Sequence, residues 1–106
     1  MSILYEDKYL ICDDNAITIY QYYFPVGSKR IPYSLITKVT ERSMDWLSGK
    51  IRIWGMDFSP EWFHFDSERP RKSRCIVIDE GETIKVAITP ENHATVLEIL
   101  REQISY

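Results

Sequence analysis

The pattern of apolar and polar positions is clearest in the last third of the chain, where it predicts a strand. Ile84, Val86 and Ile88 occupy every second position. A period of two residues is typical of a strand with one face in the core and one face toward solvent. This segment is therefore expected to be a half-buried strand that leads directly into the next element.

That next element is predicted to be a single amphipathic helix over about residues 90–104. Thr89 can accept hydrogen bonds from the first-turn amides as N-cap, and Pro90 suits the first helical position. At about 100° per residue, one arc of the helix collects most of the apolar side chains. The arc contains His93, Val96, Leu97, Leu100 and Ile104. Such a stripe is typical of a helix that packs on a sheet.

The chain from about residue 8 to residue 88 predicts short strands separated by tight turns. The turn clusters Asp13-Asp14-Asn15 and Asp79-Glu80-Gly81-Glu82 each predict a hairpin. Extended segments are expected at residues 8–12, 16–24, 29–31, 35–42, 50–54, 62–66, 74–78 and 83–88. Because an apolar sheet face and an apolar helix stripe can cover each other, residues 1–106 predict one mainly β domain with one C-terminal helix and only antiparallel strand neighbours.

Three short motifs in this order of elements support a family resemblance. They are Ile31-Pro32-Tyr33-Ser34-Leu35-Ile36, Ile53-Trp54-Gly55 and Ile88-Thr89-Pro90-Glu91. With the order of strands and the final helix, the chain resembles the bacterial pleckstrin-homology-like (PH-like) domains. The resemblance implies a seven-stranded antiparallel barrel or orthogonal sandwich whose C-terminal helix plugs one open end. It also implies frequent assembly into oligomers.

The sequence departs from the lipid-binding members of that family at one loop. Pleckstrin-homology domains that bind phosphoinositides carry basic residues around the loop between the first two strands. Here that loop is Asp13-Asp14-Asn15, and Lys8 is the only cation on the first expected strand. Since this local charge repels phosphate, phosphoinositide binding is not expected there.

Composition narrows the classes of partner. Thirteen Lys and Arg against sixteen Asp and Glu give a net charge of −3, which argues against nucleic-acid binding. No apolar run approaches the ~20 residues that cross a bilayer, and the first residues do not resemble a signal peptide, so a cytoplasmic location is expected. Cys12 and Cys75 lack the spacing of a zinc or redox motif and are expected to be buried thiols.

The densest positive cluster is a candidate binding segment. It consists of Arg69, Arg71, Lys72 and Arg74, within six residues around Pro70. Guanidinium groups at this density could bind a carboxylate, a phosphate or an acidic protein surface. The alternative is a solvated loop whose charges pair with nearby carboxylates and protect a strand edge from aggregation.

Aromatic residues are the second candidate. Trp54 and Trp62 lie on what reads as the polar face of their strands, and exposed tryptophans often anchor protein contacts. Their alternative role is to fill the ends of a small barrel. Both interpretations remain open for each ring.

Catalytic chemistry finds no support in the sequence. His64 reads as outward-facing on its strand, His93 lies on the apolar arc of the helix, and neither has a partner at metal-binding spacing. The acidic pairs in the two turns are explained by solvation. No catalytic residue, cofactor or metal is therefore expected.

The sequence thus predicts a non-enzymatic interaction module. It would bind a protein partner or self-associate as a homo-oligomer through its PH-like surface. The alternative function is binding of an anionic lipid headgroup or membrane surface through the segment from Arg69 to Arg74.

Overall fold

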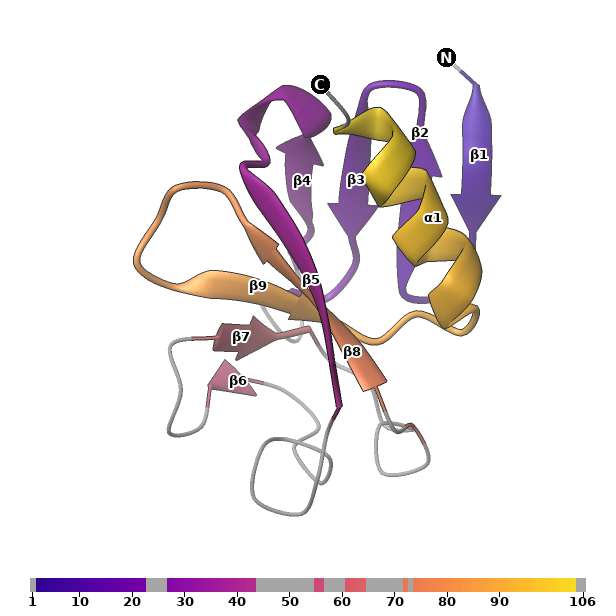
Figure 1. Ribbon diagram of the computed structural model, residues 1–106. Helices are drawn as coiled ribbons and strands as arrows, with labels where there is room; N and C mark the ends of the chain where they lie inside the picture. Colours follow the sequence, from indigo (N-terminus) through magenta and orange to yellow (C-terminus); the bar gives the residue numbers. More distant parts are fainter. Residues whose placement is uncertain are drawn as a thin grey trace.

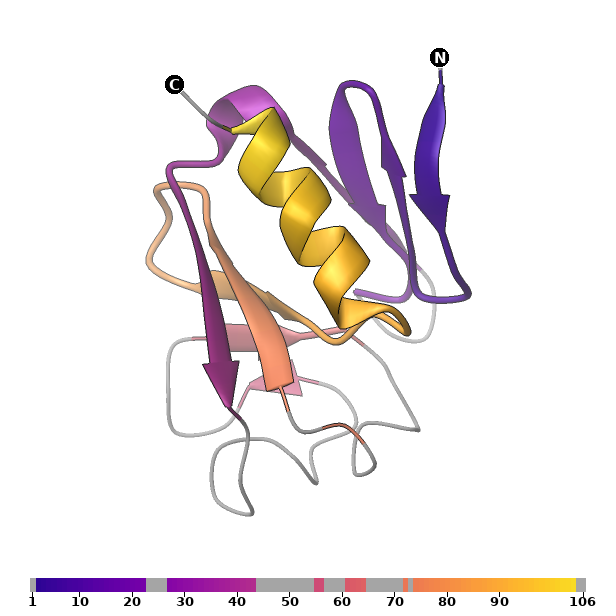
Figure 2. The same cartoon turned by 45° about the vertical axis from the view of Figure 1, so that its right-hand side comes forward.

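The computed structural model contains two β-sheets and one C-terminal helix (Figures 1 and 2). It describes residues 2–22, 27–43, 55–56, 61–64, 72 and 74–104. The first sheet is antiparallel and contains β1 (Ile3–Glu6), β2 (Leu10–Asp13), β3 (Ala16–Ile19) and β4 (Lys29–Pro32), in that order. A short 3-10 turn, η1 (Tyr33–Leu35), leads from this sheet to the second one.

The second sheet has the strand order β5-β8-β9-β7-β6. Its members are β5 (Lys38–Ser43), β6 (Gly55–Met56), β7 (Glu61–Phe63), β8 (Arg74–Asp79) and β9 (Lys85–Ile88). The pairs β5–β8 and β8–β9 are antiparallel, whereas β7 runs parallel to β9. The chain between β5 and β8 thus adds its own two strands at the far side of β9.

This arrangement corrects two expectations from the sequence. The parallel β7–β9 pair contradicts the prediction that all neighbours are antiparallel. The closed barrel is also wrong, because among the described strands no pairing joins the two sheets. Period-two patterns cannot distinguish a parallel from an antiparallel neighbour, since both place alternate side chains on one face.

One apolar core joins the two sheets and α1 (His93–Gln103). In the first sheet Leu10 and Cys12 are fully buried, while Ile11 between them is half-exposed. The second sheet and the helix complete the core with Ile76, Ile78, Val86, Ile88, Val96, Leu97 and Leu100. The apolar arc predicted for the helix is thus confirmed, and Figure 1 shows α1 lying over the first sheet beside β5. Within the described ranges, no helix has the length and apolar character needed to span a bilayer.

The helix begins three residues later than the sequence predicted. Its N-cap is Asn92, whose side chain accepts a hydrogen bond from the backbone N–H of Thr95 at 3.1 Å. Thr89, the predicted cap, is fully buried in the link between β9 and α1. Asn is at least as strong an N-cap as Thr. Here it is the Asn92 side chain that reaches a first-turn amide, that of Thr95.

The strand β1 lies outside the predicted extended segments. Hydrogen bonds between residues at its end and distant backbone amides explain why this segment is ordered as a strand. Asp7 Oδ1 accepts from the backbone N–H groups of Tyr9 and Leu10, at 2.7 and 3.1 Å. Its other oxygen, Oδ2, accepts from the backbone N–H of Glu91 at 2.8 Å. Tyr5 Oη accepts from the backbone N–H of Asn92 at 3.0 Å. The end of β1 is therefore tied to the approach to α1.

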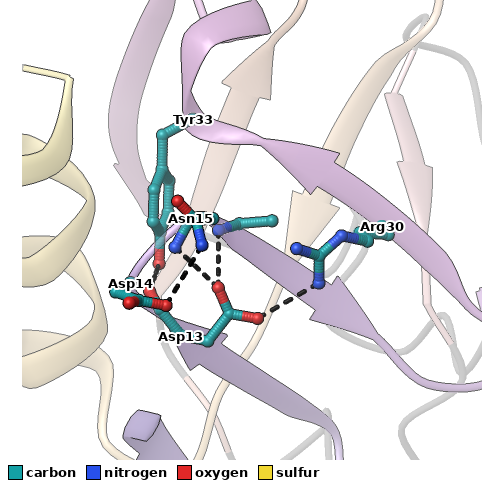
Figure 3. Close-up of polar contacts among 6 residues, drawn as sticks. Asp13, Asp14, Asn15, Arg30 and Tyr33 are labelled. Carbon is teal, nitrogen blue, oxygen red and sulfur yellow. Dashed lines mark hydrogen bonds and ion pairs between the residues drawn. The ribbon is translucent and has the colours of Figure 1, made fainter. Parts of the chain in front are cut away.

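The turn between β2 and β3 differs from the solvated turn that the sequence predicted (Figure 3). Asp13 is only 2% exposed, and its Oδ1 accepts from the backbone N–H groups of Asn15 and Ala16 at 2.7 and 2.8 Å. Its Oδ2 receives Arg30 Nη1 at 3.1 Å. The Tyr33 hydroxyl donates to the Asp13 carbonyl oxygen at 2.7 Å. Three donors thus compensate the buried carboxylate, and a fourth binds the backbone carbonyl oxygen of the same residue. A solvated turn would not need these partners.

Candidate functional site

An open groove runs between α1 and the strands β5 and β8, with a volume of about 500 Å³. We call it the helix–strand groove. The residues that line it include Glu41, Arg74, His93, Leu97, Glu98 and Arg101. It exists because α1 packs its apolar arc on the core and leaves its next face beside the ends of two paired strands.

A single carboxylate oxygen organises the charged wall of the groove. Glu41 Oε2 is 2.8 Å from Arg74 Nη1 and 2.6 Å from His93 Nε2. Glu41 lies on β5, Arg74 on β8 and His93 at the first turn of α1, so this carboxylate joins three elements. The contacts fix the position of the helix start relative to the second sheet.

The protonation of the pair follows from its geometry. The hydrogen bond from His93, helped by the charges of Arg74 and Arg101, holds the pKa of the Glu41 carboxyl below its usual range. An ionised carboxylate can only accept hydrogen bonds, so His93 Nε2 carries the proton and donates it to Glu41. Arg74 keeps most of its five N–H donors for other contacts, since its side chain is 53% exposed.

The imidazole of His93 is poorly placed for proton transfer to a substrate. Nε2 is bound to Glu41, and Nδ1 is buried with no hydrogen-bond partner among the described residues. A general base needs a nitrogen within about 3 Å of the reacting proton. The geometry therefore favours a positioning role for His93 over an acid–base role.

The floor of the groove is apolar and its rims carry both signs of charge. Leu97 is 8% exposed and forms part of the core, while Ala94 beside it is exposed. Glu98 and Arg101 lie on the exposed side of the same helix. An apolar strip with charged rims can contact an apolar side chain and the polar groups next to it.

The described members of the predicted basic segment lie in different surroundings. Lys72 Nζ donates to the carbonyl oxygen of Thr89 at 2.6 Å and lies 4.3 Å from the centroid of the Tyr9 ring. Arg74 instead reaches the helix–strand groove. Arg69 and Arg71 lie outside the described residues. Of the two members that are described, only Arg74 lines the groove.

The predicted tryptophans are not part of this site as described. Trp54 lies outside the described residues. Trp62 belongs to β7, where its backbone is in register with Met56 and Val86. Their role in contacts remains a prediction.

His64 corrects the expectation of an outward-facing histidine. It is fully buried, and its Nε2 lies 3.0 Å from the backbone N of Thr89 and 3.3 Å from the Thr89 hydroxyl. Its ring also stands 5.5 Å from that of Tyr9. Residue 64 follows the end of β7, so strand alternation does not determine the direction of its side chain.

Of the residues that line the groove, the sequence predicts Arg74 as a site residue and does not predict the others, among them Glu41, His93 and Arg101. They are distant in sequence and meet only through packing of α1 beside β5 and β8. The one local signal is the four-residue spacing of His93, Leu97 and Arg101, which places them along one side of a helix. This spacing does not identify the strand that they face.

Three comparisons with known proteins add no relative to this picture. No protein-family model matches the chain, and neither a search of curated proteins nor a search of solved structures finds a match.

Proposed function

We propose that this chain is a non-enzymatic interaction domain that binds a segment of a partner protein in the helix–strand groove. The observation that carries the proposal is the shared Glu41 oxygen, which holds Arg74 and His93 in place beside the apolar floor at Leu97. Charged groups that are already positioned lose little conformational entropy when a partner binds. The remaining N–H donors of Arg74, whose side chain is 53% exposed, then select the partner.

The proposed architecture is PH-like. Four antiparallel strands, followed by the antiparallel set β5-β8-β9 and one C-terminal helix that packs on the shared core, support this proposal. The pair β6–β7, placed beside β9, departs from it. A cytoplasmic location is part of the same proposal, and it is consistent with Cys12 and Cys75 being buried thiols that form no disulfide.

Binding to an anionic membrane is the less supported function. Lys72 is used in contacts with Thr89 and Tyr9, and Arg74 is paired with Glu41. The positive charge of each residue is thus already partly compensated within the chain, which weakens its attraction to an anionic membrane. The net charge of −3 adds a weak overall repulsion from anionic lipids.

A peptide-display selection against the immobilised domain tests the proposal. Selected peptides should bind the wild type and lose at least about tenfold in affinity with Ala94→Arg, which fills the groove with a residue that still favours helix. Gln103→Arg is the matched control, because it adds the same side chain to an exposed position of the same helix. Peptides that bind Ala94→Arg and the wild type equally would contradict the assignment of the groove.

Vesicle sedimentation separates the membrane function from this one. We expect no binding to phosphatidylcholine vesicles that contain phosphatidylserine. Binding that disappears at high salt, together with a failed peptide selection, would favour the membrane instead.

A further inference from the structure

One row of residues crosses the whole first sheet, and its charge changes from negative at one edge to positive at the other. The strand register places Glu6 beside Ile11, Ile11 beside Thr18, and Thr18 beside Arg30. The row therefore begins with an acid on the edge strand β1, passes two uncharged side chains, and ends with a base on the edge strand β4.

This row lies on the outer face of the sheet, away from the core. Ile11 and Thr18 are half-buried, whereas the residues on either side of each are fully buried. Glu6 and Arg30 are exposed. Successive side chains of a strand point to opposite faces, so all four members of the row share the outer face.

An exposed aliphatic side chain extends this face. Ile3 is 54% exposed and is in register with Asp13, two residues along β2 from Ile11. Residues in register across a sheet lie on the same face, so Ile3, which lies beyond a bulge between Ile3 and Tyr5, adds apolar surface diagonal to Ile11.

The charges of this row are complementary to those of an identical row under one particular symmetry. A two-fold axis parallel to the strands, midway between β2 and β3, places β1 over β4 of a second copy. Glu6 then faces Arg30 of that copy, Ile11 faces Thr18, and both pairs occur twice. An axis across the strands would instead stack β1 on β1 and bring like charges together.

We infer that a second copy of this chain packs face to face on the outer side of the first sheet, about this axis. Stacked sheets lie about 10 Å apart with nearly aligned strands, which this symmetry satisfies. Arg30 already contacts Asp13 at 3.1 Å, yet its side chain is 51% exposed and a guanidinium has further donors for a carboxylate. This surface is separate from the helix–strand groove, so either assignment can fail without the other.

The size of the face sets the affinity to be expected. Four strands and four residues along each strand give a footprint of about 19 by 13 Å. Stable interfaces bury about 800 Å² on each partner, which is more than this face offers. The dimer should therefore be weak, with a dissociation constant in the micromolar range or above.

Sedimentation equilibrium from about 10 μM to about 1 mM tests the inference. The average mass of the wild type should rise with concentration from 12.6 kDa toward twice that value. Thr18→Arg, in the middle of the row, should weaken association at least about tenfold. Thr40→Arg is the matched control, because Thr40 is an exposed strand residue of the second sheet, and it should associate like the wild type. Circular dichroism and thermal melting establish that both variants are folded.

A charge exchange tests the symmetry itself. Glu6→Arg and Arg30→Glu should each be more monomeric than the wild type. In either variant, residues 6 and 30 carry the same charge and face each other twice across the axis. An equimolar mixture of the two variants should associate again, since both pairs are then complementary. A wild type that stays at 12.6 kDa, an unaffected Thr18→Arg, or a mixture that remains monomeric would overturn the inference.

Discussion

The turn after β2 and the turn after β8 have the same local chemistry and different surroundings. In each, an aspartate Oδ1 accepts from the backbone N–H two residues later, at 2.7 Å for Asp13 and 2.8 Å for Asp79. Asp13 is buried and also engages Ala16 and Arg30 (Figure 3). The Asp79 side chain is half-exposed and makes the contact to Gly81. From this comparison we expect Asp13 to contribute more to stability than Asp79, because it has more partners and is buried.

The largest expected effect is that of Asp13→Ala. It leaves the N–H groups of Asn15 and Ala16 without the carboxylate and removes the partner of Arg30. We expect a loss of about 2–4 kcal/mol in the free energy of unfolding, measured by urea denaturation. The matched control is Asp14→Ala at the adjacent, exposed position, which should change stability by less than about 0.5 kcal/mol. Equal effects at the two positions would contradict the comparison.

The same carboxylate should give the stability a pH dependence. The amide of Asn15, followed by that of Ala16 and by Arg30, lowers the pKa of Asp13, although burial opposes this. Because the pKa is lower in the folded state, the stabilisation is complete above the unfolded pKa near 4 and is lost as the pH falls through the folded value. The stability difference between wild type and Asp13→Asn should thus shrink below about pH 4. A difference that stays constant from neutral pH to pH 2 would contradict this role.

Tyr33→Phe should have an intermediate effect. It deletes the hydroxyl that donates to the Asp13 carbonyl oxygen at 2.7 Å in a buried site. The loss should be about 1–2 kcal/mol in urea denaturation, because a buried acceptor is left without its donor. In the background of Asp13→Ala the cost should be smaller, since the turn is already loosened. Additive losses would show that the hydroxyl and the carboxylate act independently.

The smallest expected effect is that of Asp79→Ala. The Asp79 carbonyl oxygen still accepts from Thr37 in this variant, at 2.8 Å from its backbone N and 3.0 Å from its hydroxyl. Among the described residues, the side chain of Asp79 loses its exposed hydrogen bond to Gly81, so the change in thermal stability should correspond to about 0.5 kcal/mol or less. A loss as large as that of Asp13→Ala would mean that local turn chemistry alone determines the energy.

The elements that the sequence predicted well depend on local patterns. The hairpins around Asp13 and Asp79 and the apolar arc at Val96 and Leu100 follow from side-chain periods and turn residues that lie close together in the chain. The strand β1 and the late helix start do not, because Asp7 and Tyr5 hold the amides of residues 91 and 92 across more than eighty residues.

The candidate site was less predictable than the fold. Arg74 stood out through local charge density, but the sequence does not indicate that Glu41 would bind it together with His93. His64 was assigned to the wrong environment, since it lies just beyond a strand. Sites assembled from separate elements depend on how those elements pack together. The spacing of apolar and polar residues along the sequence does not encode this packing.

Both backbone polar groups of Thr89 are hydrogen-bonded to side chains, so the exchange of its amide proton can report on these contacts. Its N–H donates to His64 Nε2, which requires the imidazole tautomer protonated at Nδ1, and its carbonyl oxygen receives Lys72. Hydrogen–deuterium exchange at this one amide should therefore be slow, although Thr89 lies in neither a strand nor a helix. The exchange rate would report how often the hydrogen bond between His64 and the segment that joins β9 to α1 opens.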